Sequence, residues 1–362
     1  MLCAAAASTF PARPVAPAVD AHTHIAPTEH ARAARHFDAA GVDWAVNLSG
    51  GWPGGPLEAQ LEAARAEGRV STAVSLPWRF SSHPRFVPVA VELLEAATRL
   101  GVRALKIEKA LGLSARDLDG ERLPVDSRRL DPIWAAAGRL GLPVMIHTGD
   151  PAAFWEPVTP DNERFRELSV HPGWSNHGVP GLPSFEALLS ELERVVARHP
   201  GTVFVSVHFG NHAEDPAAVA AQLDRYPNLR VDLAARIVEL GRRDPSGLRA
   251  LFVRHAGRIL LGTDLGLWPR GGVMLGSTGD TPDTDDEVPG YYRAHWAWLE
   301  TSARIPSPVP IQGDWRITGI ALDVATARRI ERDNAEALFG PPPWRARAAA
   351  RHPPFFRMVD RR

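Results

Sequence analysis

Asp20-Ala21-His22-Thr23-His24 comes directly after an apolar run that starts at Pro17. The run is typical of a buried β-strand, and residues two apart in a strand point to the same face of the sheet. His22 and His24 are therefore expected to project side by side from the end of this strand. Two neutral imidazoles in this arrangement form half of a site for a divalent metal ion such as Zn²⁺.

The same local design recurs along the chain. An apolar run ends in a possible metal ligand at three later places: 144–146 before His147, 203–207 before His208, and 259–263 before Asp264. Short apolar runs bounded by glycine and proline are typical of fully buried strands. In a parallel barrel, catalytic groups collect at the carboxyl ends of the strands. Four histidines and one aspartate at such ends predict a metal-dependent active site.

Strand and helix patterns alternate through most of the chain. Strands are expected near residues 17–24, 42–48, 70–76, 102–107, 143–147, 202–208, 229–233 and 258–263. Helices are expected near residues 57–67, 88–100, 130–140, 184–198 and 324–339. Eight strands separated by helices predict an α/β fold, a distorted (β/α)₈ TIM barrel with a long insertion after strand eight. A doubly wound sheet fits the same pattern, but no Gly-x-Gly-x-x-Gly turn follows the first strand. The expected division is an Ala/Pro-rich lead-in over 1–17, a metal-dependent barrel over 18–340 and a Pro/Arg-rich tail over 341–362.

The composition narrows the class of protein. The 362 residues include 41 Lys and Arg against 42 Asp and Glu, so charge favours neither nucleic acid nor an anionic membrane as partner. Cys3 is the only cysteine, which excludes an intrachain disulfide. No apolar run approaches the roughly 20 residues that cross a bilayer, and no basic residue precedes the apolar part of the first 17 residues. A cytoplasmic enzyme with a small-molecule substrate is expected, with a homodimer as one possible assembly.

These residues together resemble the amidohydrolase superfamily, in the amidohydrolase-related branch that contains aminocarboxymuconate-semialdehyde decarboxylase. The resemblance covers about residues 19–340. It is carried by the Asp20–His24 motif, His147, His208, the Gly262-Thr263-Asp264 sequence and the final Asn334–Phe339 helix. The chain departs from the branch in having Thr263 where serine is frequent, and in the length of the segment between Asp264 and Val324.

The resemblance implies a distorted TIM barrel that holds one divalent ion, with zinc favoured and manganese as the alternative. The matching ligands are His22, His24, His147 and Asp264, and His208 would lie beside the metal-bound water. Zinc lowers the pKa of bound water from 15.7 to roughly 7. Asp264 can then accept and return a proton, while His208 contacts the water or the substrate carbonyl.

The same residues serve two reactions. The favoured function is a metal-dependent hydrolase that uses a metal-activated water to cleave a C–O or C–N bond of a lactone, ester or amide. The alternative is a non-oxidative decarboxylase (a carboxy-lyase) of an unsaturated or aromatic carboxylic acid. The ligand set itself does not separate the two reactions.

Three further residues are predicted to bind substrate, each with an alternative. Lys106 could bind a carboxylate, pair with Glu108, or be carboxylated and bridge a second metal. Arg236 could clamp an anionic group bidentately, or form a surface salt bridge. Trp268 could line an aromatic mouth, or pack on the barrel rim.

The segment after Asp264 is expected to shape specificity. The part around 268–277 is predicted to overhang the metal and form part of the pocket. The acidic stretch 280–287 is predicted to lie in solvent. The aromatic stretch 291–299 suits an amphipathic helix packed on the barrel.

Overall fold

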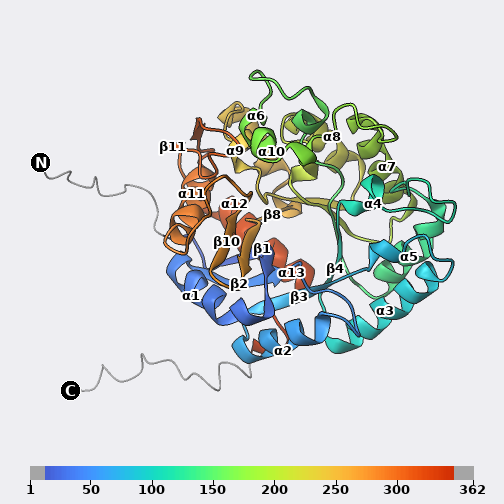
Figure 1. Ribbon diagram of the computed structural model, residues 1–362. Helices are drawn as coiled ribbons and strands as arrows, with labels where there is room; N and C mark the ends of the chain where they lie inside the picture. Colours follow the sequence, from blue (N-terminus) through green and yellow to red (C-terminus); the bar gives the residue numbers. More distant parts are fainter. Residues whose placement is uncertain (1–12, 346–362) are drawn as a thin grey trace, which may run out of the picture.

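The computed structural model describes residues 13–345, and a ring of parallel strands lies at its centre (Figure 1). The barrel strands are β1 (Ala18–Ile25), β2 (Val42–Asn47), β3 (Val70–Ser75), β4 (Ala104–Ile107), β5 (Val144–Ile146), β6 (Phe204–Ser206), β7 (Leu229–Asp232) and β8 (Ile259–Leu260). Each strand pairs in parallel with the next along the chain. The predicted (β/α)₈ barrel is confirmed. The expected lead-in and tail lie largely outside the described residues.

The ring closes between the chain that follows β8 and strand β1. The Ala21 amide donates to the Leu261 carbonyl over 2.9 Å, and the Asp264 amide donates to the His22 carbonyl over 2.9 Å. Strand β8 is only two residues long, so these bonds replace a regular ladder. They also place Asp264 beside His22 at the seam of the barrel.

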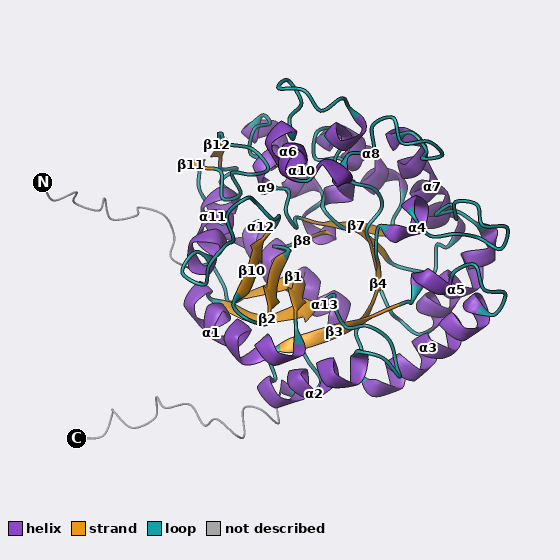
Figure 2. Ribbon diagram, in the orientation of Figure 1, coloured by secondary structure: helices purple, strands orange, loops and turns teal. Residues whose placement is uncertain are grey.

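Helices form the layer outside the strands (Figure 2). The main helices are α1 (His30–Ala40), α2 (Leu57–Glu67), α3 (Phe86–Leu100), α5 (Asp131–Arg139), α7 (Phe185–Arg198), α8 (Pro216–Arg225) and α10 (Pro245–Arg254). Short helices α4 (Ala110–Leu113), α6 (Phe165–Val170) and α9 (Ile237–Leu240) lie in the connections. The last helix is continuous through α12 (Val324–Arg328), a π-helical turn (Arg329–Asp333) and α13 (Asn334–Phe339).

Helix α7 shows why the outer helices form where the sequence predicts them. Its buried residues recur at spacings of three and four along one face: Phe185, Leu188, Leu189, Glu191, Leu192, Val195 and Val196. The Ser184 hydroxyl caps its first turn by accepting a hydrogen bond from the Ala187 amide. The apolar stripe faces the barrel, so burial of this stripe fixes the helix on the strands.

The barrel interior is filled by a separate apolar cluster. Its members include Val19, Ala21, Trp44, Val46, Ala73, Met145, Val205 and Leu260. Ala335 and Phe339 of α13 join the same cluster, so the last helix plugs one end of the barrel. The opposite end is left for polar side chains.

A register shift in β1 turns the two histidines toward that polar end. Val19 and Ala21 belong to the inner cluster, whereas Ala18 belongs to the outer one. The pairing of β1 with β2 shifts register between Asp20 and Thr23. Such a shift re-aims the side chains that follow it, which the simple two-residue alternation of a strand does not anticipate.

The insertion after β8 adds two hairpins and a helix. Strands β9 (Leu265–Trp268) and β10 (Gly272–Leu275) form an antiparallel pair, and β9 extends the barrel sheet by pairing with β1. Helix α11 (Val288–Glu300) follows, and then the small hairpin of β11 (Arg304–Pro306) and β12 (Arg316–Thr318). The expected amphipathic helix is present. The hairpin joined to the sheet was not predicted.

The acidic stretch of the insertion is mostly exposed, as predicted, but it is anchored at one point. Asp285 accepts hydrogen bonds from Arg32 Nε over 2.7 Å and His36 Nε2 over 2.6 Å, both from helix α1. The Arg32 guanidinium also donates to the carbonyls of Trp268, Gly271 and Gly272. Helix α1 therefore holds the turn between β9 and β10 in place.

Across residues 13–345, no helix combines the length and the apolar character needed to span a membrane.

Glu331, in the π-helical turn, is expected to make stability depend on pH. Burial, and then the charge of Glu300, raise the pKa of its carboxyl well above the ordinary value. The unfolded chain therefore loses this proton at lower pH than the folded chain, and the free energy of unfolding falls as pH rises from about 4.5 toward the folded pKa. Glu331→Gln is expected to raise this free energy at pH 8.5 by at least about 1 kcal/mol more than at pH 5. Thermal unfolding at both pH values checks it.

The exposed Glu62 provides the matched control. Glu62→Gln removes a carboxyl group from the solvent-facing side of α2. It is expected to change the free energy of unfolding by the same amount at both pH values. An equal effect of Glu331→Gln at pH 5 and pH 8.5 would show that its carboxyl is ionised in the fold throughout this range.

Candidate metal centre and active site

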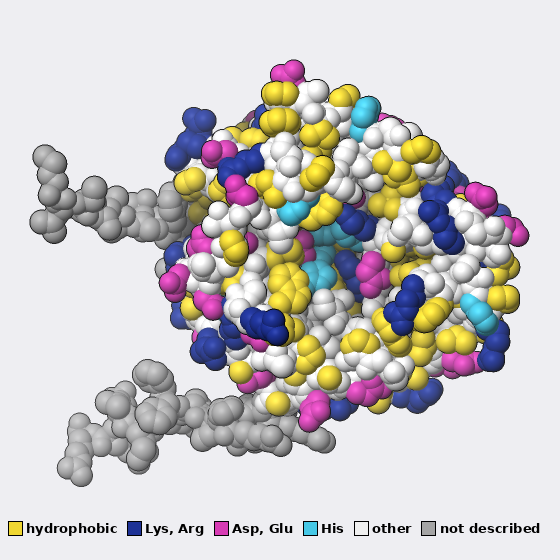
Figure 3. Space-filling model, in the orientation of Figure 1, with side chains coloured by type: hydrophobic (Ala, Val, Ile, Leu, Met, Phe, Trp, Pro, Cys, Tyr) yellow, Lys and Arg dark blue, Asp and Glu magenta, His cyan; other side chains and the backbone are white. Residues whose placement is uncertain are grey.

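The candidate site lies at the carboxyl ends of the barrel strands. Figure 3 shows a hollow in this face with histidine side chains exposed in it. The predicted residues come from four different strand ends: His22 and His24 from β1, His147 after β5, His208 after β6 and Asp264 after β8. The barrel thus brings side chains from distant parts of the sequence to one place.

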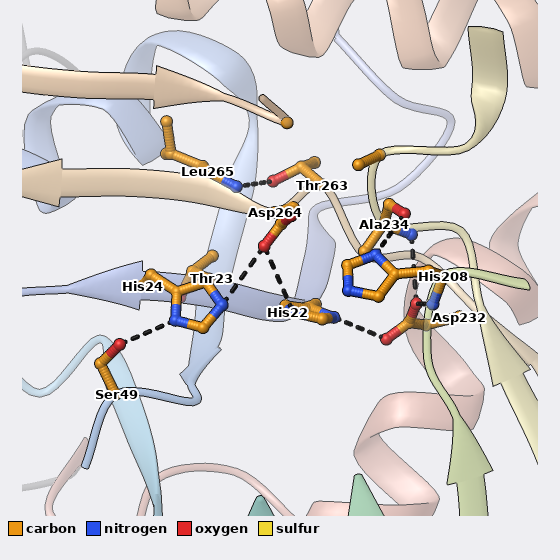
Figure 4. Close-up of polar contacts among 12 residues, drawn as sticks. His22, Thr23, His24, Ser49, His208, Asp232, Ala234, Thr263, Asp264 and Leu265 are labelled. Carbon is orange, nitrogen blue, oxygen red and sulfur yellow. Dashed lines mark hydrogen bonds and ion pairs between the residues drawn. The ribbon is translucent and has the colours of Figure 1, made fainter. Parts of the chain in front are cut away.

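His22, His24 and Asp264 form the tightest group of possible metal ligands (Figure 4). Asp264 Oδ1 lies 3.3 Å from His22 Nε2 and 3.3 Å from His24 Nε2. One ligand atom from each residue lies within 4.8 Å of the other two. His22 is fully buried, and 22% of the His24 side chain is exposed.

A second set of hydrogen bonds orients the two imidazoles. His22 Nδ1 lies 2.8 Å from Asp232 Oδ2, and His24 Nδ1 lies 2.7 Å from Ser49 Oγ. Asp232 is completely buried and also accepts from the His208 amide over 2.7 Å. A carboxylate partner fixes a neutral histidine with its proton on Nδ1 and its lone pair on Nε2.

The charges and lone pairs of these three side chains favour a bound cation. Burial lowers the pKa of His22, so its ring is neutral at neutral pH. Its Nε2 is buried, has no hydrogen-bond partner in the described part of the chain and aims a lone pair at Asp264. Burial opposes ionisation of Asp264, and the pKa of its carboxyl falls well below the ordinary range only where the neighbouring rings carry positive charge. Neutral rings supply no such charge, whereas a bound divalent cation would. Lone pairs that converge on an ionised carboxylate repel one another unless a cation lies among them, and two histidines with one aspartate suit Zn²⁺ or Mn²⁺.

His147 and His208 lie next to this group. The ring centroids of His22 and His208 are 4.8 Å apart, and those of His147 and His208 are 4.4 Å apart. His147 is not one of the three clustered ligands. Its Nε2 is nevertheless buried and has no hydrogen-bond partner among residues 13–345. His147 as fourth ligand therefore stays a prediction.

The tautomer of His208 is also determined by its surroundings. Burial lowers the pKa of His208 well below the ordinary value, so the ring is neutral. Its Nδ1 lies 2.9 Å from the Ala234 carbonyl, which can only accept, so Nδ1 carries the proton. The lone pair of His208 is therefore on Nε2, and this side chain lines the cavity described below.

The backbone at the site is held in an uncommon conformation. His208, Ala235 and Asp264 have φ values of 58°, 55° and 67°, in the left-handed region that residues with side chains rarely adopt. Such conformations cluster at functional sites and persist only where the surroundings over-determine them. Gly262 is a necessary neighbour, because a Cβ there would lie 2.9 Å from the His22 Cβ.

A cavity of about 160 Å³ opens next to these residues. His147, His208 and Asp264 form its inner wall, and Phe154 and Trp174 contribute aromatic surface. Met274, Gly276 and Ser277 of the insertion also line it. This placement agrees with the expectation that the segment around 268–277 shapes the pocket.

Arg236 supplies positive charge to the cavity wall. Its Nη2 donates to Asn211 Oδ1 over 2.7 Å, and its Nη1 donates to the Ala235 carbonyl over 2.8 Å. Burial lowers the pKa of Arg236 to about 10, so the guanidinium remains charged at neutral pH. Within residues 13–345 its Nε has no hydrogen-bond partner, and it lies 4.0 Å from Glu239 Oε1. Arg164, which also lines the cavity, is neutralised by Glu167 and Glu239.

Lys106 and Trp268 are not among the residues that line this cavity, although the charges of Lys106 and Asp264 lie close enough to act on each other. Lys106 is buried in the barrel, and burial lowers the pKa of its ammonium group. Its Nζ has no hydrogen-bond partner and no ion pair with Glu108 among the described residues. Trp268 is 38% exposed at the end of β9, outside the lining. Substrate binding by either residue stays a prediction without a contact that favours it.

Two buried carboxylates that hold the candidate ligands in place are not among the residues predicted from the sequence. Asp232 ends the apolar run of β7 in the same way that His208 ends its run, so the strand-end signal was present in the sequence. Asp20 stands within the first motif and is completely buried, with its carboxylate bonded to Thr263 and Tyr292. No sequence signal connects Asp20 with a tyrosine 272 residues away.

Comparison with known proteins identifies the family to which the chain belongs. A family model described as Amidohydrolase matches residues 19–340. No curated protein matches the chain in sequence. Among solved structures, a dihydroxybenzoic acid decarboxylase from Polaromonas sp. JS666, determined with bound manganese and 2-nitroresorcinol, has 13% identity and a TM-score of 0.52. The alignment covers 90% of this chain and 97% of that one.

Two other solved structures have similar coverage. A 2,6-dihydroxybenzoate decarboxylase from Rhizobium has 14% identity and a TM-score of 0.49, over 90% of this chain and 98% of that one. A probable 2-pyrone-4,6-dicarboxylic acid hydrolase from Acinetobacter baumannii has 12% identity and a TM-score of 0.48, over 90% and 99%. The family model, which spans most of the sequence, identifies the chain as a member of the amidohydrolase family of metal-dependent enzymes.

Proposed function

We propose that this enzyme is a hydrolase that cleaves a C–O or C–N bond of a small lactone, ester or amide. His22, His24 and Asp264 would hold one divalent ion, with His147 as the fourth ligand and zinc as the favoured metal. The observation that carries the proposal is the convergence of Nε2 of His22 and Nε2 of His24 on the Asp264 carboxylate, each 3.3 Å from Oδ1. That convergence lies beside the cavity, where Asp264 is itself part of the wall.

A divalent ion bound there would lower the pKa of a coordinated water to roughly 7 and polarise a carbonyl oxygen. Asp264 lines the cavity and would be ionised beside that ion, so its carboxylate can accept a proton from the attacking water and return it to the leaving oxygen or nitrogen. His208 offers its Nε2 lone pair as a second acceptor in the same wall. Asp232 keeps His22 in the tautomer that leaves its Nε2 free.

The cavity limits the size and character of the substrate. A volume of about 160 Å³ suits a molecule with one small ring or a short chain. Phe154 and Trp174 favour a planar, partly apolar body. Arg236, which lines the same cavity, favours a carboxylate or another anionic group on the substrate.

The second candidate function is non-oxidative decarboxylation, and Arg236 is the observation that favours it. A decarboxylase needs a cation near the carboxylate that leaves as CO₂, and this buried guanidinium lines the same cavity as His208 and Asp264. The two reactions differ in their products rather than in the residues that they require.

Paired screens test the proposal. One screen offers lactones, esters and amides that carry a carboxylate, and the other offers unsaturated and aromatic acids with detection of CO₂. Hydrolysis of at least one compound, lost with a chelator and restored by Zn²⁺, is the expected result. Release of CO₂ that depends on His208 and Asp264, with every hydrolytic substrate inert, would replace the hydrolase by the decarboxylase.

Arg236→Gln is expected to raise KM for a carboxylate-bearing substrate by 10-fold to 100-fold while kcat changes less. The loss of a charge-assisted hydrogen bond costs about 1.5–3 kcal/mol, which corresponds to this range. Steady-state kinetics with the acid and with its neutral methyl ester would measure the effect, because only the acid engages the guanidinium.

Arg166→Met serves as the control for loss of an arginine on the same side of the molecule. Arg166 is exposed and lies 3.9 Å from Asp280, so its removal is expected to leave KM unchanged. Equal KM changes for the acid and the ester in Arg236→Gln would mean that Arg236 acts on the fold of the wall and not on the substrate charge.

A further inference from the structure

Two tyrosines of the insertion reach back to the backbone that carries Asp264. Tyr291 and Tyr292 lie in the first turn and a half of α11, roughly 28 residues along the chain from the ligand that they approach. Both side chains are buried. Neither belongs to the lining of the cavity as described for residues 13–345. They can therefore act on the site only through other residues.

Tyr292 acts on Asp20, which joins the two strands that carry metal ligands. Tyr292 Oη donates to Asp20 Oδ2 over 2.8 Å, and Thr263 Oγ1 donates to the same oxygen over 2.5 Å. Asp20 Oδ1 accepts from the amides of His22 and Thr263, each over 3.1 Å. One carboxylate thus ties the segment that carries His22 to the residue directly before Asp264, and Tyr292 holds that carboxylate from the outside.

Tyr291 acts on the peptide bond that precedes Asp264. Tyr291 Oη donates to the Thr263 carbonyl over 2.5 Å. The amide on the other side of the same peptide bond, that of Asp264, donates to the His22 carbonyl over 2.9 Å. Both polar groups of this peptide are therefore held, and they are held from opposite directions. Rotation of the peptide plane would break both bonds.

This restraint matters because Asp264 adopts a left-handed backbone conformation, with φ at 67°. A residue with a side chain leaves that region readily unless its neighbours prevent it. A change at this φ would swing the carboxylate away from His22 Nε2 and His24 Nε2. Burial raises the pKa of both tyrosines well above the ordinary value, so their hydroxyls remain protonated donors.

We propose that Tyr291 and Tyr292 are positioning residues that hold Asp264 in its metal-binding conformation, through the Thr263 carbonyl and the Asp20 carboxylate. The insertion after strand eight is then part of the metal centre as well as a wall of the cavity. The inference rests on the proposed function in one respect only, namely that Asp264 is a metal ligand. It holds equally for a hydrolase and a decarboxylase.

The test is the affinity of the metal-free protein for Zn²⁺, measured by competition with a chromophoric chelator. Tyr291→Phe and Tyr292→Phe each remove a single oxygen atom and are assayed separately and together. Outer partners of metal ligands typically contribute 10-fold to 100-fold in metal affinity, so each variant is expected to raise the Kd for Zn²⁺ by about tenfold. Separate assays ensure that loss of the fold in one variant leaves the other as a test.

Tyr226→Phe is the matched control, because it removes the only other tyrosine hydroxyl of the chain. Tyr226 Oη donates to Glu193 Oε2 over 3.2 Å, and no residue of the site takes part in this contact. Its Kd for Zn²⁺ is expected to equal that of the wild type. Thermal unfolding of all metal-free variants separates an effect on the metal site from an effect on the fold.

The outcomes distinguish this inference from the function on which it rests. Weaker Zn²⁺ binding in both tyrosine variants, with unfolding temperatures of the metal-free forms near that of Tyr226→Phe, supports the positioning role. Tight binding by the wild type with unchanged affinity in both variants would overturn the inference alone. Absence of Zn²⁺ binding by the wild type would overturn the proposed function, and the inference with it.

Discussion

Asp264→Asn is expected to lower kcat/KM by at least about 10³-fold. The amide has nearly the shape of the carboxylate but has no charge, and it cannot accept a proton at neutral pH. Loss of a general base alone typically costs 10²-fold to 10⁴-fold, and the variant would also lose one anionic ligand beside His22 Nε2 and His24 Nε2. Kinetics with any substrate found by the paired screens, at saturating Zn²⁺, would measure the loss.

Asp280→Asn is the control for this change within the same insertion. Asp280 is exposed, and its nearest cationic partner is Arg166 at 3.9 Å. It is expected to retain full activity. An Asp264→Asn variant within tenfold of wild-type kcat/KM would show that Asp264 neither binds the metal nor moves a proton during turnover.

His22→Ala is expected to abolish tight metal binding, with the Kd for Zn²⁺ raised by at least about 10³-fold. Loss of a residue that only hydrogen-bonds to a ligand typically weakens metal binding by 10-fold to 100-fold. The effect here is larger because one of only three or four protein ligands is removed. The fold holds His22 in its ligand orientation, because Asp232 Oδ2 lies 2.8 Å from its Nδ1. Elemental analysis after purification, followed by competition titration, would measure both content and affinity.

His83→Ala provides the matched histidine control, because His83 is exposed on the connection before α3. It is expected to bind one equivalent of metal with wild-type affinity. A His22→Ala variant that kept a full equivalent of metal at wild-type affinity would place the ion elsewhere in the molecule.

Much of the barrel could be predicted because burial leaves a strong signal. Helix α2 (Leu57–Glu67) has the predicted bounds, and the strands fall where apolar runs end in glycine, proline or a polar residue. The strand ends located the candidate ligands for the same reason. A residue that follows a buried parallel strand emerges at the carboxyl face whatever the details of the helices.

The relative positions of the ligand atoms could not be predicted, because they depend on contacts across the barrel. The register shift in β1 and the left-handed conformation of Asp264 decide which atoms meet, and neither has a local pattern. His147 lies next to His208 because two neighbouring strand ends pack together, and its role as fourth ligand stays a prediction. Lys106 is buried in the barrel, and its contact with substrate also stays a prediction.

The insertion was the least predictable part. Its helix was recognised from aromatic residues, but the β9–β10 hairpin has few residues and joins the sheet only because β1 offers a free edge at the seam. The bonds from Tyr291 and Tyr292 to Thr263 and Asp20 follow from that placement. These tyrosines contact neighbours of the ligands and do not themselves follow a buried strand. No pattern in the sequence therefore predicts their role.

The most direct test of the metal centre is anomalous X-ray diffraction from crystals of the Zn²⁺-loaded protein, recorded on both sides of the zinc absorption edge. We expect one strong peak, with Nε2 of His22 and His24 and a carboxylate oxygen of Asp264 at about 2.0–2.2 Å and His147 as the fourth protein ligand. A peak coordinated by other residues, or no peak at this position in fully loaded crystals, would contradict the account.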